Sequence, residues 1–182
     1  MQERRLELVV CAAPLARRAH DLAAHLTASG WDVTATTSVN AISWVDTGAL
    51  AAVSRAVADR SPGTPRPRPA SAVVLAPGTF NTLNKLRSGI SDTPALGVLN
   101  DAIGQQLPLL VIPMISERLI DHPAWAETTT WLSHLNVTFL DPSTGRTGAI
   151  GPLRSGTGEE VTARFSPAWV TGWANGLPAA AR

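Results

Sequence analysis

The residues of this sequence that could do chemistry gather in short turns that follow apolar segments. The most polar turn consists of Pro77, Gly78, Thr79, Phe80, Asn81 and Thr82. Gly78 lets the backbone come close to a ligand, because glycine has no side chain to obstruct it. The hydroxyl and amide groups beside it can hold a flat ring with a polar edge, and Phe80 would supply an apolar plate. The alternative is a helix N-cap followed by a phenylalanine packed in the core.

Two further turns offer places where a phosphate group could bind. Thr36, Thr37 and Ser38 end one apolar segment, and Ala12 with Ala13 follows another. Hydroxyls at a strand end can bond phosphate oxygens, or they can cap the next helix. Backbone amides after Ala13 can hold an anion at a helix start, or they can form a plain turn. Neither G-x-G-x-x-G spacing nor a Walker lysine is present, which disfavours a standard dinucleotide or nucleoside-triphosphate site.

The elements that must position these turns alternate along the chain. Short apolar runs predict strands at 6–11, 31–36, 71–76, 109–112 and 136–140. Helical spacing predicts helices at 16–29, 48–59, 80–88, 94–107, 121–135 and 168–175, with caps at Thr47 and Thr93. This alternation predicts an α/β fold, namely a doubly wound, Rossmann-like parallel sheet with helices on both faces in three layers. Ligands bind such sheets outside the carboxyl ends of the strands, where the polar turns lie.

Composition narrows the class of protein further. The 182 residues suit about one domain, and 45% hydrophobic with 16% charged residues can bury a core. A net charge of +1 gives no electrostatic footprint for nucleic acid, and no apolar run is long enough to span a membrane. The N-terminus lacks a signal-peptide pattern, so we expect a cytoplasmic protein. The single cysteine, Cys11, provides no cysteine metal cluster, and we expect it to be an inert buried thiol.

Several of these segments resemble one family. The turn at 77–82 resembles the P-A-S/T-A-N-T motif of the homo-oligomeric flavin-containing cysteine decarboxylases, which include phosphopantothenoylcysteine decarboxylase and peptidyl-cysteine decarboxylases. Residues 85–92 are similar to the family's K-I-A-x-G-I-x-D-N segment. Residues 113–119 resemble P-x-M-N-x-x-M, and 122–124 resemble N-P-x. The segments follow the family's order and spacing over roughly residues 6–142.

The resemblance implies a flavoprotein that binds FMN and assembles as a homo-oligomer, a trimer or a dodecamer, with the flavin at a subunit interface. The cofactor-binding residues that it implies are Ala12, Ala13, Thr36, Ser38, Pro77, Thr79, Phe80, Asn81, Thr82 and Met114. The substrate would be a small molecule or a peptide that carries a carboxylate. Its expected binding residues are Ser116, Arg118 and Arg154, and the candidate catalytic residues are Asn81, Glu117 and His122. We expect no metal.

The sequence departs from the family at one catalytic position. The family's active-site histidine lies a little over a dozen residues before the P-A-S-A-N-T turn, and residues 63–69 contain no histidine here. Asp92, Glu117 or His122 could take its role, and the sequence selects none of them. We therefore expect a decarboxylase-like FMN protein, with two alternatives. One is an FMN-dependent oxidoreductase that does not decarboxylate, and the other is a non-catalytic assembly subunit.

The composition changes near residue 142. Residues 1–142 are predicted to form the flavin-binding domain, and 143–182 a mobile tail like a substrate clamp with a C-terminal helix. In that tail Arg154 would pair with a substrate carboxylate, or it would lie in an exposed turn. The proline-rich segment 61–69 is predicted to be an extended connection.

Overall fold

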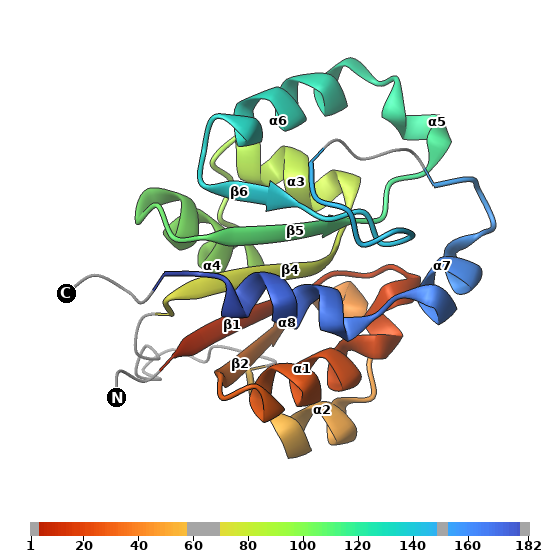
Figure 1. The fold of residues 1–182 in the computed structure, drawn as a ribbon. Coiled ribbons are helices and arrows are strands. Elements are labelled where there is room, and N and C mark those ends of the chain that lie inside the picture. The colour runs from red at the N-terminus through yellow and green to blue at the C-terminus, as the bar shows by residue number, and fades with distance from the viewer. Residues whose placement is uncertain (1–3, 58–69, 149–152, 179–182) are drawn as a thin grey trace.

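The computed structural model describes residues 4–57, 70–148 and 153–178. Within these ranges six parallel strands form one sheet in the order β3-β2-β1-β4-β5-β6 (Figure 1). The strands are β1 (Arg5–Val10), β2 (Asp32–Thr37), β3 (Arg55–Val57), β4 (Ala72–Gly78), β5 (Leu109–Pro113) and β6 (Val137–Phe139). The predicted α/β class is confirmed. The proline-rich segment 61–69 lies outside the described residues.

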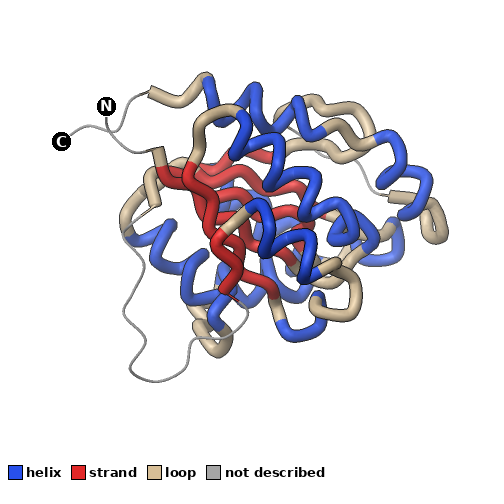
Figure 2. Tube along the Cα trace, turned by 90° about the horizontal axis from the view of Figure 1, so that it is seen from below, coloured by secondary structure: helices blue, strands red, loops and turns tan. Residues whose placement is uncertain are grey.

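Helices cover both faces of the sheet (Figure 2). They are α1 (Ala19–Ala28), α2 (Thr47–Val53), α3 (Phe80–Arg87), α4 (Pro94–Gly104), α5 (Glu117–Ile120), α6 (Pro123–Ser133), α7 (Gly158–Arg164) and α8 (Pro167–Asn175), with short 3₁₀ turns η1 (Pro14–Arg18) and η2 (Val39–Ala41). Side chains of β1 alternate between two cores. Leu8 and Val10 share one core with α1 and α8, and Val9 shares the other with α3, α4 and α6. Because both faces are buried, the strand is almost continuously apolar.

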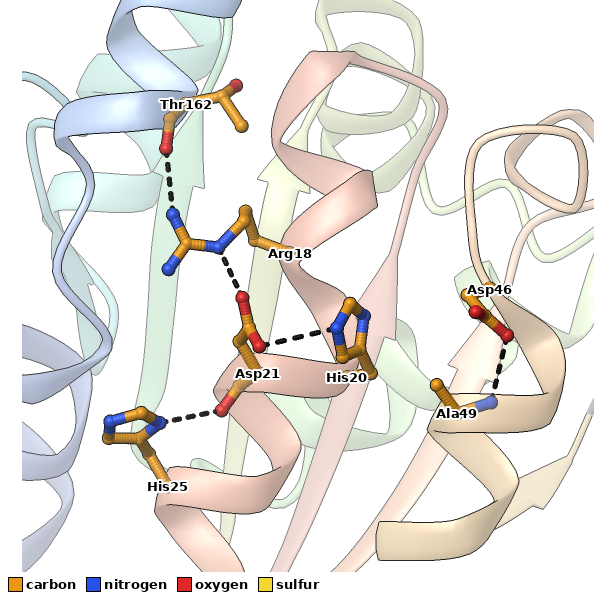
Figure 3. Close-up of polar contacts among 7 residues, drawn as sticks. All are labelled: Arg18, His20, Asp21, His25, Asp46, Ala49 and Thr162. Carbon is orange, nitrogen blue, oxygen red and sulfur yellow. Dashed lines mark hydrogen bonds and ion pairs between the residues drawn. The ribbon is translucent and has the colours of Figure 1, made fainter.

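Two helix starts show how the local sequence sets these boundaries. Thr93 Oγ1 accepts a hydrogen bond from the backbone N–H of Leu96 at 3.2 Å, so the predicted cap of α4 is confirmed. The predicted cap at Thr47 is wrong by one residue, because Asp46 Oδ1 accepts from the N–H of Ala49 at 2.9 Å (Figure 3). Either side chain can cap a helix, and the sequence does not decide between neighbours of equal capping ability.

Two predicted helices differ from the structure. The helix expected at 48–59 ends at Val53, and Arg55–Val57 forms edge strand β3 beside β2. Here the backbone pairs with the open edge of the sheet, and this pairing outweighs the helical pattern of the segment. The periodicity of one segment does not reveal such a pairing. The helix expected at 16–29 is divided into η1 and α1, which meet at Ala19.

The C-terminal segment packs against the start of the chain. Val170 and Ala174 of α8 are fully buried in the core that α1 shares with β1. Arg18 forms an ion pair with Asp21 and donates a hydrogen bond to the carbonyl of Thr162 in α7 at 3.1 Å (Figure 3). The tail that the sequence predicts at 143–182 therefore contains two packed helices, of which α7 was not predicted.

A substitution of Gly145 tests the contact between α8 and the turn that follows β6. Its φ is +71°, and a Cβ atom would overlap the ring of Trp169. Gly89 has a similar φ of +68° with nothing near its missing Cβ, so it is a matched control. We expect Gly145→Ala to lower the free energy of unfolding by about 3 kcal/mol, and Gly89→Ala by about 1 kcal/mol, in urea denaturation. Equal losses for the two variants would contradict the packing of Trp169.

Candidate functional site

A cavity of about 420 Å³ lies at the carboxyl ends of β1, β2 and β4. Its walls come from residues 11–12 after β1, 38–40 after β2, the cap and first turns of α3, and Thr93, Ala95 and Leu96 at the start of α4. β1 lies between β2 and β4, and the connections after β1 and β4 lead to helices on opposite faces of the sheet. Such a divergence of connections creates a crevice where ligands bind in open α/β sheets. The volume is typical of a ligand pocket.

Half of the predicted cofactor-binding residues meet in this cavity. The structure brings together Ala12, Ser38, Thr79, Asn81 and Thr82. They lie as much as 70 positions apart in the sequence, and the sheet places their turns at one edge. Thr79 Oγ1 accepts from the N–H of Thr82 at 3.3 Å and so caps α3 while it lines the cavity. The two interpretations of this turn, ring contact and helix cap, are therefore compatible.

Thr36 lies away from the cavity. Its side chain is fully buried, and its hydroxyl donates to Glu7 Oε1 at 2.7 Å between β2 and β1. Thr36 is part of β2, whereas Ser38 follows the last residue of that strand. Ser38, which lies beyond the strand, lines the cavity, whereas the hydroxyl of Thr36, within the strand, bonds to Glu7 of the neighbouring strand.

Three other predicted cofactor residues are also absent from the cavity wall. Ala13 and Pro77 are buried, and the carbonyl of Pro77, which follows a cis peptide bond, accepts from the N–H of Cys11 at 3.2 Å. Met114 Sδ accepts from the N–H of Leu15 at 3.4 Å. These residues support the turns that form the wall, and their side chains are engaged within the protein.

Phe80 faces a different neighbour from the one expected. Its ring does not line the cavity and instead meets the ring of His122 edge-on, with 5.4 Å between centroids. His122 is the N-cap residue of α6, and its Nδ1 accepts from the N–H of Ala124 at 3.1 Å. A neutral imidazole with Nδ1 as acceptor carries its proton on Nε2. The ring of Phe80 therefore packs against the N-cap residue of α6 and not against the cavity.

The predicted substrate residues form a second group, beside α5. The N–H of Glu117 donates to the carbonyl of Leu153 at 2.9 Å, and Ser116 pairs with Leu153 in an isolated bridge. This pairing brings the exposed side chain of Arg154 near the start of α5, where Arg118 is also exposed. Residues 154 and 116–118 are thus neighbours, as the carboxylate-binding hypothesis requires, and the cavity wall includes none of them.

Cys11 is a cavity residue that sequence reasoning did not identify. The expected burial is confirmed, because the thiol is only 2% exposed. Burial raises the pKa of the thiol, and the hydrogen bonds that the hydroxyls of Thr82 and Ser38 and the backbone of Thr79 can donate to the thiolate oppose the shift. The sequence placed Cys11 inside the first strand, but β1 ends at Val10. The useful signal would have been its position at the last apolar residue of that run, where ligands bind.

The described residues contain neither a helix that could span a membrane nor a cluster that could hold a metal ion. None of their helices has the length and apolar character needed to cross a membrane. In the same part of the chain, no three histidine, cysteine, aspartate or glutamate side chains come together in a way that could hold a metal ion.

The raised pKa of Cys11 predicts a specific pH dependence of stability. Because the folded thiol keeps its proton to higher pH than the unfolded thiol, the unfolded state ionises first as pH rises past about 9. The free energy of unfolding should then fall more steeply in the wild type than in Cys11→Ala, by up to about 1.4 kcal/mol per pH unit. Denaturation curves between about pH 7 and 10 measure this difference, and the absence of tyrosine keeps the background simple. A difference that does not vary with pH would contradict the shift.

Similarity to known proteins is consistent with this architecture. The coenzyme A biosynthesis bifunctional protein CoaBC of Thermococcus kodakarensis is 34% identical over 73 residues, which are 40% of this chain and 18% of that protein. The match thus spans less than a fifth of that relative's length. A solved phosphopantothenoylcysteine (PPC) decarboxylase mutant, complexed with pantothenoylaminoethenethiol, has a TM-score of 0.72 at 19% identity, covering 96% of this chain and 97% of that chain.

Two other solved structures share the fold. The FMN binding protein AtHal3 has a TM-score of 0.73 at 20% identity and covers 96% of both chains. The peptidyl-cysteine decarboxylase EpiD has a TM-score of 0.66 at 16% identity, with 81% of this chain and 92% of that chain covered. At these identities the structural likeness shows the fold alone. A protein-family model described as Flavoprotein matches residues 1–158, and the chain therefore belongs to the flavoprotein family.

Proposed function

We propose that this chain binds FMN in the cavity at the carboxyl ends of β1, β2 and β4. We further propose that it uses the flavin on a small or peptide-borne carboxylate substrate, as cysteine decarboxylases do. One observation carries the proposal: five residues that the family motifs assign to the cofactor line a single cavity. Membership of the flavoprotein family and the likeness to an FMN binding protein support it.

The chemistry of the cavity wall fits a flavin ring. Such a ring has apolar faces and an edge of hydrogen-bonding atoms. The wall offers the side chains of Leu96 and Val39, which is 70% exposed, together with the hydroxyl of Thr79. The amide of Asn81 is exposed and makes no hydrogen bond within the described part of the chain. That amide is available to a ligand without the loss of an existing contact.

The same wall can accommodate a negative charge. The hydroxyl of Ser38 can donate to a phosphate oxygen, and the small side chain of Ala12 leaves space beside it. Lys85 also lines the cavity, and its Nζ lies 2.5 Å from Asp92 Oδ2. Because Asp92 already compensates the charge of Lys85, we assign the contact with the phosphate to Ser38.

Bound FMN would supply a two-electron acceptor, and the chain must hold the substrate and move protons. We assign substrate binding to the Asn81 amide and to the group at Ser116, Arg118 and Arg154. We assign proton transfer to the imidazole of His122, whose Nδ1 would exchange its hydrogen bond from the N–H of Ala124 for a proton from the substrate. Glu117 lies in the same group, and its Oε1 accepts from the N–H of residue 155 at 3.3 Å.

A second candidate is an FMN-dependent oxidoreductase that does not decarboxylate. It is favoured by the position of His122, which caps α6 and contacts the ring of Phe80 outside the cavity wall. Among the described residues, no histidine lines the cavity. The stretch 63–69, which lacks the family's histidine, lies outside the described residues. Product analysis separates the two candidates, because only a decarboxylase releases carbon dioxide.

Asn81→Ala tests the cofactor cavity. The purified wild type should show flavin absorbance or acquire it on addition of FMN. We expect Asn81→Ala to raise the dissociation constant for FMN, or KM for substrate, about three- to tenfold. The thermal unfolding midpoint should not fall, since the amide has no described partner and alanine favours helix. Asn136→Ala, an exposed asparagine before β6, is the control and should leave binding unchanged. A wild type that stays colourless with excess FMN would refute the proposed function.

His122→Asn tests the assigned proton role. Asparagine is a good N-cap, so α6 should remain stable while the imidazole is lost. With a peptide that ends in cysteine, or with phosphopantothenoylcysteine, we expect carbon dioxide release by the wild type and a loss of about 10²-fold in kcat for the variant. Full turnover in His122→Asn would remove the proton role. Flavin reduction without carbon dioxide release would establish the second candidate instead.

A further inference from the structure

Three hydrogen-bonding groups follow one another along the cavity wall, and the first has no part in the proposed function. Sγ of Cys11 lies 3.3 Å from Oγ1 of Thr82, and that oxygen lies 3.0 Å from Oγ1 of Thr79. Cys11 is 2% exposed and Thr82 is 9% exposed, so both are shielded from solvent. All three side chains line the cavity. They form one continuous chain from the end of β1 to the first turn of α3.

The direction of this chain follows from the donors and acceptors available. Each group has one hydrogen to donate, and the hydroxyl of Thr82 can give its hydrogen to only one neighbour. In both side-chain contacts either atom could be the donor. When a ligand in the cavity accepts the hydrogen of Thr79, the Thr82 hydroxyl must donate to Thr79, and the Cys11 thiol then donates to Thr82. Burial raises the pKa of Cys11, which keeps the thiol protonated for this donation.

The oxygen of Thr79 is then fully engaged as an acceptor. It accepts from the backbone N–H of Thr82 at 3.3 Å and from the Thr82 hydroxyl at 3.0 Å. A hydroxyl oxygen has two lone pairs, and both are used in this arrangement. The hydrogen of Thr79 remains free to donate, and the cavity is where a ligand can accept it. With an acceptor in the cavity, the chain thus supports Thr79 as a donor.

We propose that Cys11 and Thr82 are positioning residues that hold the Thr79 hydroxyl as a hydrogen-bond donor to the polar edge of the bound flavin ring. This inference rests on the proposed function. An oxidised isoalloxazine ring presents carbonyl oxygens and unprotonated nitrogens at that edge, which are acceptors. The donor that the chain supports at Thr79 is therefore the complement of the ligand.

Paired substitutions test the chain one link at a time. Thr82→Val removes the hydroxyl with little change of shape, and Cys11→Ala removes the thiol. We expect each to raise the dissociation constant for FMN about three- to tenfold and to shift the flavin absorption bands. Thr82→Ser and Cys11→Ser keep a donor at the same position and should restore both values. Thr162→Val replaces a buried threonine outside the cavity and should change neither.

The single cysteine provides a readout that needs no flavin. The S–H stretching band in the infrared spectrum belongs to Cys11 alone. In Thr82→Val it should move toward the frequency of a free thiol, and in the wild type it should shift when FMN is added. If Thr82→Val does not fold, the Cys11 variants carry the binding test, since they replace the thiol with small side chains.

The outcomes separate this inference from the proposed function. A wild type that binds FMN, with unchanged affinity and spectrum in both Thr82→Val and Cys11→Ala, overturns the inference and leaves the proposed function standing. The inference is also overturned if Cys11→Ala weakens binding and Cys11→Ser does not restore it, because bulk rather than hydrogen bonding would then matter. A wild type that does not take up FMN refutes both.

Discussion

Backbone hydrogen bonds that continue past the strand ends hold the candidate site together. The N–H of Ser38 donates to the carbonyl of Val10 at 2.9 Å, and the N–H of Cys11 donates to the carbonyl of Pro77 at 3.2 Å. These two bonds extend the β2–β1 and β1–β4 pairing beyond the last paired residues of each ladder. They fix three connecting turns relative to one another before those turns diverge to opposite faces of the sheet. The cavity exists because of this divergence, and these bonds hold the turns of its wall together.

The packing of side chains on both faces of the sheet also positions the carboxyl ends of the strands. Both faces of β1 are buried, with Val10 in the core shared by α1 and α8, and Val9 in the core shared by α3 and α4. A shift of β1 by one residue would exchange these two sets of side chains, so the register is strongly specified. The positions of the residues that follow β1 are therefore a consequence of core packing. The hydrogen-bond chain through the Cys11 thiol depends on that register.

Much of the fold was predictable because its signals are local. Apolar runs mark β1, β2, β4 and β5, and the predicted cap at Thr93 marks the start of α4. The convergence of the turns around Ser38 and Asn81 was also predictable, since parallel strands bring their carboxyl ends to one edge. The rule that ligands bind outside the carboxyl ends of parallel strands identifies the edge of the sheet. The family motifs then identify which turns at that edge form the cavity wall.

The features that were missed depend on tertiary context. Arg55–Val57 forms a strand because β2 offers an open edge, not because of its own pattern. The ring of Phe80 turns toward His122, and the hydroxyl of Thr36 bonds to Glu7, because those partners come from other elements. No spacing in the sequence reveals such pairings. The role of Cys11 in the wall was hidden for the same reason, because its hydrogen-bond partner Thr82 comes from α3.

The central claim is that a flavin ring lies in the cavity between the turns after β1, β2 and β4, and a crystal structure of the protein grown with FMN tests it most directly. We expect electron density for the isoalloxazine ring between Val39 and Leu96, with its polar edge at Thr79 and Asn81. Density for FMN at another surface, with side chains closing this cavity, would contradict the claim.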